Sequence, residues 1–289
     1  MTNLPKNSLR PLTPDERDFA LGAIFPTMDI KEVPSEDFVV SPPLGIKLQG
    51  EDDLCSGYAV TAVSEDQEGK ELLPEYQFFK TKQISGDPEE WGADLRDACK
   101  SATKFGSLSV EDFPNQKGIT RSQLLISEQW PADADEMAKF YKKETYFKVT
   151  GKYDMFDDIR AALWQHRYDK CSIVTGALWR QEWTEAPDGV IPSTYSDDGF
   201  GHAFKIFGQK TIEGRMYLMA QLSGGTGVGD NGIFYFPREV VNTEIGKYGV
   251  FMFKDIPRET AELYIKNNQT FGGSFWQSIW SFITNLFKN

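Results

Sequence analysis

The sequence predicts an α+β protein with a helical first half and a β-rich second half. Apolar residues recur at helical spacing between residues 55 and 105, and short apolar segments of β type recur after residue 172. The chain has 289 residues, 40% of them hydrophobic and 13% aromatic, which is enough to bury a substantial core. This order of elements, helices first and strands later, is typical of α+β proteins.

Proline, glycine and helix-capping residues indicate where the elements of the first half begin and end. The Thr-Pro-Asp-Glu run at residues 13–16 predicts a helix start, and Pro42 and Pro43 make the segment 33–46 extended. A helix is expected from about residue 55 to 68, and Gly69 ends it. Further helices are expected from the proline of the Leu-Leu-Pro-Glu-Tyr run at 72–76 and from about 95 to 105.

The second half begins with alternating helices and strands and continues with strands. We expect helices at 133–143 and 154–167 and strands at 146–149 and 172–179. His166 lies near the apolar face of the second helix, which favours a structural or surface histidine over a catalytic one. After a long loop at 181–199, strands are expected around His202, Leu218 and Ile233, and a closing strand at 250–253.

The stretch 49–60 carries a cysteine where a polar loop turns into a helix. Cys55 would face unpaired backbone N–H groups and the positive end of the helix dipole, which favours the thiolate. That is what a nucleophilic cysteine needs. A buried structural cysteine is the commoner fate of a single thiol, and this stretch alone leaves both interpretations open.

Two later segments complete a recognisable order. Residues 201–204 read Gly-His-Ala-Phe at the start of an apolar strand, and residues 217–232 form a strand that runs into a glycine-rich loop. Cysteine, then a distant histidine, then a strand–loop element is the chain order of papain-like thiol peptidases.

From these motifs the chain resembles the papain family of cysteine peptidases, which includes the cathepsins and bleomycin hydrolase, over roughly residues 34–255. Gln49 stands six positions before Cys55, as the family's glutamine stands before its nucleophile. Residues 201–204 match the family's histidine strand. The resemblance implies a papain-like fold of two lobes, a helical N-terminal lobe and an antiparallel β-barrel-like C-terminal lobe with a cleft between them.

The chain departs from the family pattern at the third catalytic position. Leu222 occupies the place of the asparagine that orients the imidazole, and Gly224 occupies the place of the tryptophan that covers this contact. The residue after the nucleophile is Ser56 instead of tryptophan. Gln221 is adjacent, but strand alternation points it to the opposite face. Losing such support usually lowers the rate without abolishing the chemistry.

The resemblance implies nucleophilic acyl transfer without a cofactor. The Cys55 thiolate would attack a peptide carbonyl, His202 would transfer the proton, and Gln49 would help hold the oxyanion. Gly92 would pair with the substrate backbone, or it is a plain turn glycine. The alternative class is a weakened or inactive papain-fold protein that binds partners. Related thiol amide hydrolysis or transfer is the third reading.

Composition limits the partners. With a net charge of −12 we expect a peptide or protein substrate and no nucleic acid. Three cysteines suggest no disulfide framework, and Cys99 and Cys171 read as core residues. With two histidines, no zinc cluster is expected. The polar residues 1–14 do not read as a signal peptide, so we expect the cytoplasm or another reducing compartment, virion association being left open.

The two ends flank the peptidase domain, which we assign to residues 34–265. The arm 1–33 would either cover the cleft or wrap the body, and we favour wrapping. After a linker at 266–274, residues 275–289 predict an amphipathic helix too short to span a bilayer. It would fold back on the protein, dock on a protein partner or a second copy, or, because it is poor in basic residues, less readily lie on a membrane surface.

Overall fold

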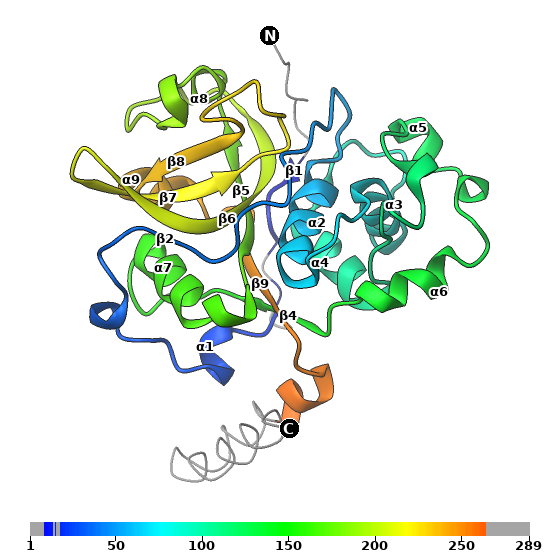
Figure 1. Ribbon diagram of the computed structural model, residues 1–289, viewed down its shortest axis with the longest axis horizontal. Helices are drawn as coiled ribbons and strands as arrows, with labels where there is room; N and C mark the ends of the chain where they lie inside the picture. The colour runs from blue at the N-terminus through cyan, green and yellow to red at the C-terminus, as the bar shows by residue number, and fades with distance from the viewer. Residues whose placement is uncertain (1–8, 14, 16–17, 264–289) are drawn as a thin grey trace.

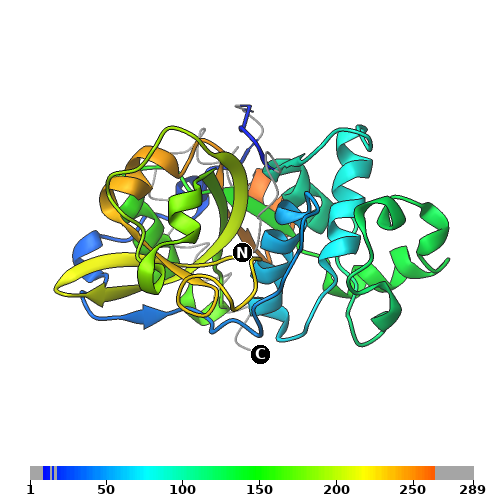
Figure 2. The ribbon, with the colours of Figure 1, turned by 90° about the horizontal axis from the view of Figure 1, so that it is seen from above.

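The computed structural model describes residues 9–13, 15 and 18–263 of the chain. In that part, a helical lobe and a β lobe stand side by side, and the N-terminal arm runs between them (Figures 1 and 2). The predicted linker 266–274 lies outside the described residues, and so does the predicted helix 275–289.

The helical lobe is built from three long helices: α2 (Cys55–Glu68), α3 (Pro74–Ser85) and α4 (Leu95–Lys104). The predicted boundaries are confirmed. Gly69 caps α2 in the left-handed conformation at φ 67°, and Pro74 occupies the first turn of α3. Shorter pieces complete this lobe: α5 (Arg121–Leu124), α6 (Ala134–Ala138), η2 (Pro114–Gln116), η3 (Ser127–Gln129) and η4 (Lys139–Tyr141).

Helix α2 is the central element because it packs on α3, on α4 and on the sheet of the other lobe. Its contact with α3 depends on Gly57, since a Cβ there would lie 2.6 Å from the carbonyl oxygen of Pro74. The missing side chain allows the start of α3 to approach the first turn of α2. This approach fixes the position of Cys55 relative to the helical lobe.

The β lobe contains an antiparallel sheet in the order β4-β9-β5-β6-β7-β8, with β2 paired to β6. The sheet is mostly antiparallel and does not close into a barrel in the described chain, where β4 and β8 form its opposite edges. The strands are β2 (Phe38–Val39), β4 (Thr145–Lys148), β5 (Ile173–Trp179), β6 (Phe200–Ile212), β7 (Arg215–Gln221), β8 (Ile233–Pro237) and β9 (Val250–Lys254).

Short helices pack around this sheet, and some of them were not expected. The predicted helix 154–167 is confirmed as α7 (Met155–Gln165), and its N-cap Asp154 accepts a hydrogen bond from the Asp157 amide. The loop 181–199 holds a short helix, and another follows β8. The remaining elements are α1 (Leu21–Ile24), α8 (Gln181–Thr184), α9 (Arg238–Glu244), η1 (Ile30–Glu32), η5 (Arg167–Asp169) and η6 (Pro187–Gly189).

The helix start expected at Thr13 is wrong. The described residues between Thr13 and Ala20 are not helical, and α1 begins only at Leu21. The reason is a tertiary contact: the Phe19 carbonyl accepts a hydrogen bond of 2.7 Å from the Lys148 amide, which holds this segment extended beside β4. Pairing with a strand therefore overrides the local capping signal.

The two lobes are joined by buried charges between α2 and β6. Lys205 of β6 lies 2.9 Å from Asp66 of α2, and both side chains are almost completely buried. The Ser172 hydroxyl also donates to Asp66. Burial raises the pKa of Asp66 and lowers the pKa of Lys205, which means that desolvation opposes both charges and that each needs the other.

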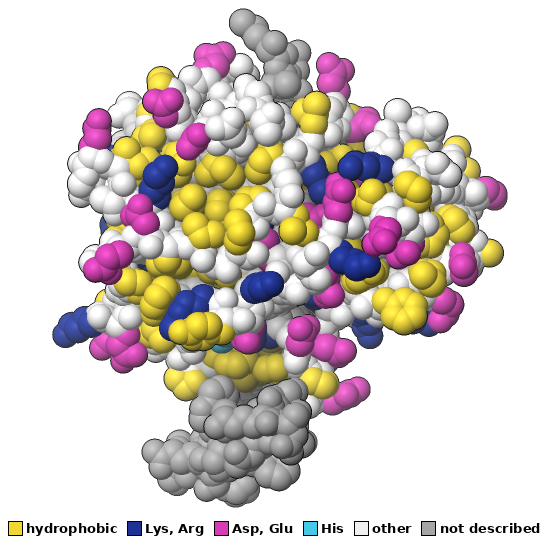
Figure 3. Space-filling model, in the orientation of Figure 1, with side chains coloured by type: hydrophobic (Ala, Val, Ile, Leu, Met, Phe, Trp, Pro, Cys, Tyr) yellow, Lys and Arg dark blue, Asp and Glu magenta, His cyan; other side chains and the backbone are white. Residues whose placement is uncertain are grey.

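The surface carries charges of both signs. On the face shown in Figure 3, acidic and basic side chains intermingle around apolar areas over the β lobe. Among the described residues, no helix combines the length and the apolar character needed to cross a membrane.

Candidate active site

Cys55 is the first residue of α2 and is completely buried. The residue before it, Leu54, provides no side-chain cap, and the first-turn amides of a helix have no acceptor within the helix. Cys99 and Cys171 are also buried, and none of the three cysteines forms a disulfide. Burial raises the pKa of the Cys99 thiol well above its ordinary value and that of the Cys171 thiol to about 11, as expected for core residues.

His202 lies near the start of β6, opposite Ala177 of β5, and is also completely buried. Its ring is 5.8 Å from the Trp179 ring and 6.2 Å from the Phe200 ring, measured between centroids. Neither ring nitrogen has a hydrogen-bond partner within the described chain. Burial lowers the pKa of His202 to about 3, so the imidazole is neutral at physiological pH.

The fold brings α2 and the start of β6 together, but the His202 ring lies on the other face of β6, against Trp179 and Phe200, while Ala203 faces α2. Cys55 and Ala59 of α2 belong to the same apolar cluster as Ala203, the neighbour of His202 in β6. Because the nitrogens of His202 lack a partner among the described residues, the thiol–imidazole hydrogen bond is not formed in this state. The cysteine and histidine segments are therefore assembled without the charged pair that nucleophilic attack requires.

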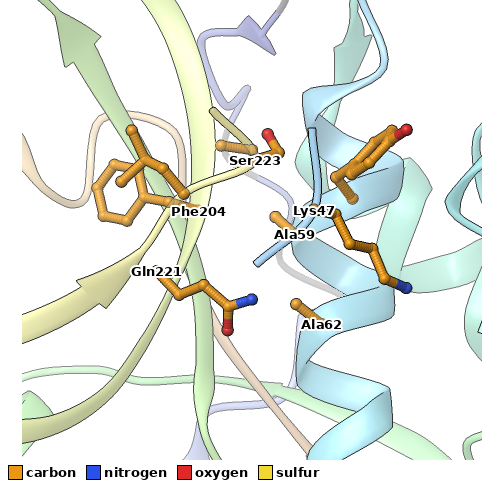
Figure 4. A pocket seen from close by; sticks show the side chains of 9 residues that line it. Lys47, Ala59, Ala62, Phe204, Gln221 and Ser223 are labelled. Carbon is orange, nitrogen blue, oxygen red and sulfur yellow. The ribbon is translucent and has the colours of Figure 1, made fainter. Parts of the chain in front are cut away.

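The third catalytic position, occupied by Leu222, has no polar side chain that could orient His202. Leu222 is buried in the core of the β lobe. The Gln221 side chain points into the space between the lobes (Figure 4) and donates to the Gly45 carbonyl at 2.9 Å, so it does not orient the imidazole. The pocket drawn there, between Ala59 and Ala62 on one side and Gln221 on the other, has a volume of about 10 Å³, roughly the space of one water molecule.

Trp179 provides an aromatic wall beside His202 that the sequence motif did not indicate. It stands on β5 instead of the β7–β8 connection, and its indole N–H donates to the Thr184 hydroxyl at 2.8 Å. Its ring also contacts those of Phe234 and Phe236. Only the pairing of β5 with β6 brings Trp179 to the histidine, so local sequence patterns could not reveal it.

Gln49 lies beside the glycine-rich connection between β7 and β8. Its amide N–H pairs with the Ser223 carbonyl at 2.9 Å, and its side-chain oxygen accepts a hydrogen bond from the Ser223 hydroxyl. Its side-chain nitrogen donates to the Asp52 carbonyl at 2.7 Å. An amide nitrogen carries two hydrogens, so one donor of Gln49 is engaged in this state and a second remains.

Gly92 adopts φ 73°, a conformation that favours glycine, but its backbone groups are used inside the protein. Its N–H donates to the Asp53 carboxylate, and its carbonyl accepts a hydrogen bond of 2.7 Å from Lys82 Nζ. The edge that pairs with another strand is the next pair of residues, β3 (Ala93–Asp94).

That edge is occupied by the chain's own arm. Strand β1 (Leu9–Arg10) pairs in parallel with β3 between the lobes. The Leu9 carbonyl approaches the β lobe so closely that a Cβ on Gly201 would lie 2.0 Å from it, and the Leu9 side chain meets Gly176 in the same way at 2.2 Å. Near Leu9 the arm therefore fills the space between the lobes, a correction to the interpretation that it simply wraps the body.

His166 has the structural role that its position suggested. It is buried, its Nδ1 lies 3.2 Å from Lys254 Nζ, and its ring packs edge-on against Phe25. Burial, together with the charge of Lys254, lowers its pKa to about 3. Within the described part of the chain, no group of three or more histidine, cysteine or acidic side chains could hold a metal ion.

Neither a protein-family profile nor a curated protein sequence matches this chain. Solved structures do match. Xylellain, a cysteine protease from Xylella fastidiosa, has a TM-score of 0.70 and 19% identity, with 87% of this chain and 97% of that chain covered. Procathepsin L 3 from the larval midgut of Tenebrio molitor has a TM-score of 0.59 and 15% identity, covering 82% and 75%.

Bromelain from Ananas comosus, solved with the inhibitor E64, has a TM-score of 0.54 and 16% identity, with 76% of this chain and 99% of that chain covered. At such identities the likeness establishes the fold alone. The expected α+β architecture of a helical lobe and a mostly antiparallel β lobe is thereby confirmed: the chain has the papain-like cysteine protease fold.

Proposed function

We propose that the protein is a cysteine peptidase with Cys55 as nucleophile and His202 as its general base and acid. The observation that carries the proposal is the opposition of two segments: the first turn of α2, which starts at Cys55, faces the start of β6 across the joint of a papain-like fold. The solved neighbours named above are described as proteases of this type or their precursors. A peptide or protein is then the substrate.

In the proposed reaction, Cys55 Sγ transfers its proton to His202 and attacks the carbonyl carbon of the scissile bond. The imidazolium then gives this proton to the leaving amine, which leaves an acyl thioester on Cys55. His202 next takes a proton from water, whose oxygen attacks the thioester carbonyl carbon. The C–S bond then breaks, the acid is released, and His202 returns the proton to the Cys55 sulfur. The free N–H of Gln49 and the Cys55 amide are suited to hold the oxyanion.

The arm gives this peptidase a latent state. A neutral imidazole with a pKa of about 3 cannot serve as the charged partner of a thiolate, and burial is the cause of that low value. Displacement of Leu9 would open the apolar cluster that contains Cys55 to water and substrate. Procathepsin L 3 from Tenebrio molitor, one of the similar solved proteins named above, is described as a precursor.

The test is turnover of a fluorogenic peptide library by the full chain and by its Leu9→Asp variant, which places a charge in the apolar contact of the arm. We expect turnover to rise at least tenfold in Leu9→Asp and to disappear when Cys55→Ala is added. Leu44→Asp is the matched control because Leu44 is 53% exposed. Absence of Cys55-dependent turnover in every variant would refute the peptidase.

A second candidate is a papain-fold protein that binds peptides without turnover. It is favoured by Leu222, which is buried in the core, and by the lack of a polar partner for His202 within the described chain. Iodoacetamide labelling distinguishes the two. If the thiol is activated, the Leu9→Asp protein should be labelled at Cys55, and adding His202→Ala should suppress this labelling. A binding protein predicts slow labelling that His202→Ala leaves unchanged.

A further inference from the structure

The arm contributes two adjacent side chains that lie in chemically different surroundings. Leu9 is 3% exposed and belongs to the apolar cluster that contains Cys55, Ala203 and Tyr248. Arg10, the next residue, reaches the helical lobe, where its guanidinium lies 2.5 Å from an Asp87 carboxylate oxygen. The arm thus lies between the lobes, with its apolar side chain in a cluster that both lobes share and its basic side chain on the helical lobe.

The carboxylate that receives Arg10 is held in place from the opposite side. Asp87 Oδ1 accepts hydrogen bonds from the Ser85 hydroxyl and, at 3.3 Å, from Lys82 Nζ. Lys82 has a side chain with no exposed surface and also donates to the carbonyls of Asp87, Glu90 and Gly92. Oδ2 is the oxygen that faces the arm.

The same contacts keep Asp87 charged. Burial alone would raise its pKa, but the hydrogen bonds from Ser85 and Arg10 and the positive charges of Lys82 and Arg10 outweigh burial and lower it. A carboxylate that is fixed in place and ionised at neutral pH is well suited to select a cation, because little reorganisation is needed when the cation arrives.

We propose that Asp87 forms an acidic subsite of the cleft, which selects peptides carrying an arginine or lysine beside an apolar residue. The ion pair between the Arg10 guanidinium and Asp87 shows that this carboxylate accepts a cation. Leu9 occupies the apolar cluster where the neighbouring side chain of a bound peptide would lie. As a statement about substrates, the inference rests on the proposed peptidase; as a statement about peptide binding, it does not require catalysis.

The arm itself fits this subsite incompletely. Arg10 Nε is buried and has no hydrogen-bond partner within the described chain, and the ion pair to Asp87 runs through a single terminal nitrogen. An arginine on a separate peptide can adjust its backbone and offer two parallel N–H donors to the carboxylate. A lysine offers a point charge and is expected to bind less tightly than arginine.

The experiment measures peptide binding by fluorescence anisotropy to the full chain carrying Leu9→Asp, to loosen the arm, and Cys55→Ala, to prevent cleavage. The probes are a labelled Ser-Leu-Arg-Pro-Leu peptide, which copies residues 8–12, and the same peptide with glutamine for arginine. We expect the arginine peptide to bind about three- to tenfold more tightly at low salt, the range of a partly exposed ion pair, with a smaller ratio at high salt.

The matched variants are Asp87→Asn, which keeps the shape and removes the charge, and Glu111→Gln, which removes a charge from an exposed pair with Lys70. The preference should vanish in Asp87→Asn and persist in Glu111→Gln. Thermal unfolding checks that Asp87→Asn is folded. If it is not, Asp87→Glu supplies the test, because the retained charge should retain the preference.

Two results would overturn the subsite: equal affinity for the two peptides, including no binding of either, or a preference that survives Asp87→Asn. Failure of the peptidase proposal has a different signature. In that case the chain that retains Cys55 shows no turnover, while discrimination between the two peptides is still measured in the Cys55→Ala chain.

Discussion

At the scale of single residues, the surroundings of His202 oppose the stability of the folded protein. It is completely buried among aromatic rings, and neither ring nitrogen is paired within the described chain. A buried polar group without a partner costs about 1–3 kcal/mol. Such a cost is expected at a functional position, because the group must find its partner in another state of the molecule.

We therefore expect His202→Leu to raise the free energy of unfolding by roughly 1 kcal/mol at pH 7 while it removes any reactivity of Cys55. The gain should grow at lower pH. Between a folded pKa of about 3, lowered by burial, and an unfolded value of 6.5, the unfolded chain binds a proton that the folded chain does not. The stability of the native protein therefore falls by about 1.4 kcal/mol for each unit below pH 6.5 from this group.

The measurement is urea unfolding of both proteins at several pH values from 7 to 4. His166, whose pKa burial also lowers to about 3, is present in both proteins and cancels in the difference. A difference that stays constant over this range would mean that His202 is not a buried neutral imidazole in the native state.

At the scale of elements, α2 fixes the position of the candidate nucleophile. It begins at Cys55 and packs on two helices and on β6, so a small shift of its first turn would move the sulfur relative to the β lobe. Gly57 is the closest point of this packing. Helix contacts of this kind tolerate little added volume because protein interiors are close-packed.

Gly57→Ala should destabilise the protein by about 1–3 kcal/mol, since the new Cβ would lie 2.6 Å from the backbone oxygen of Pro74 and α3 would have to move. Gly45→Ala is the control, because a Cβ at Gly45 meets no atom within 4 Å. Chemical denaturation of both variants gives the comparison. Equal stabilities would show that α3 yields without cost and that Gly57 does not set the approach.

At the scale of the whole molecule, the two lobes are held together by a buried ion pair as well as by apolar packing. Lys205 of β6 and Asp66 of α2 are 139 positions apart in sequence and meet where the two lobes pack together. A buried pair contributes little net stability, but losing one partner leaves a charge without compensation. The relative placement of Cys55 and His202 therefore depends on this pair.

We expect Lys205→Met to cost about 3–5 kcal/mol, because Asp66 would remain buried without its cation. Adding Asp66→Asn should recover part of this loss, since the amide oxygen can still accept the hydrogen bond from Ser172. A double-mutant cycle of unfolding free energies gives the coupling. Strictly additive losses would contradict an interaction between the two side chains.

The local sequence determined the helical elements and the candidate reactive residues. Proline and glycine set the limits of α2 and α3 through backbone geometry that acts within a few residues, and the motifs around Cys55 and residues 201–204 indicated the papain-like architecture. The buried strand β5 and the helix α7 were also predicted close to their observed limits, from the local pattern of apolar residues.

Tertiary structure decided the rest, because the forces involved connect distant segments. Pairing of Phe19 with Lys148 overrode a helix-start signal, and pairing of β5 with β6 brought Trp179 to His202. The position of Leu9 across the cleft depends on the shapes of both lobes at once. No local motif encodes burial, which lowers the pKa of His202 and leaves its imidazole neutral. Nor does a motif encode the close approach of Leu9 to Gly201 and Gly176, which fills the space between the lobes.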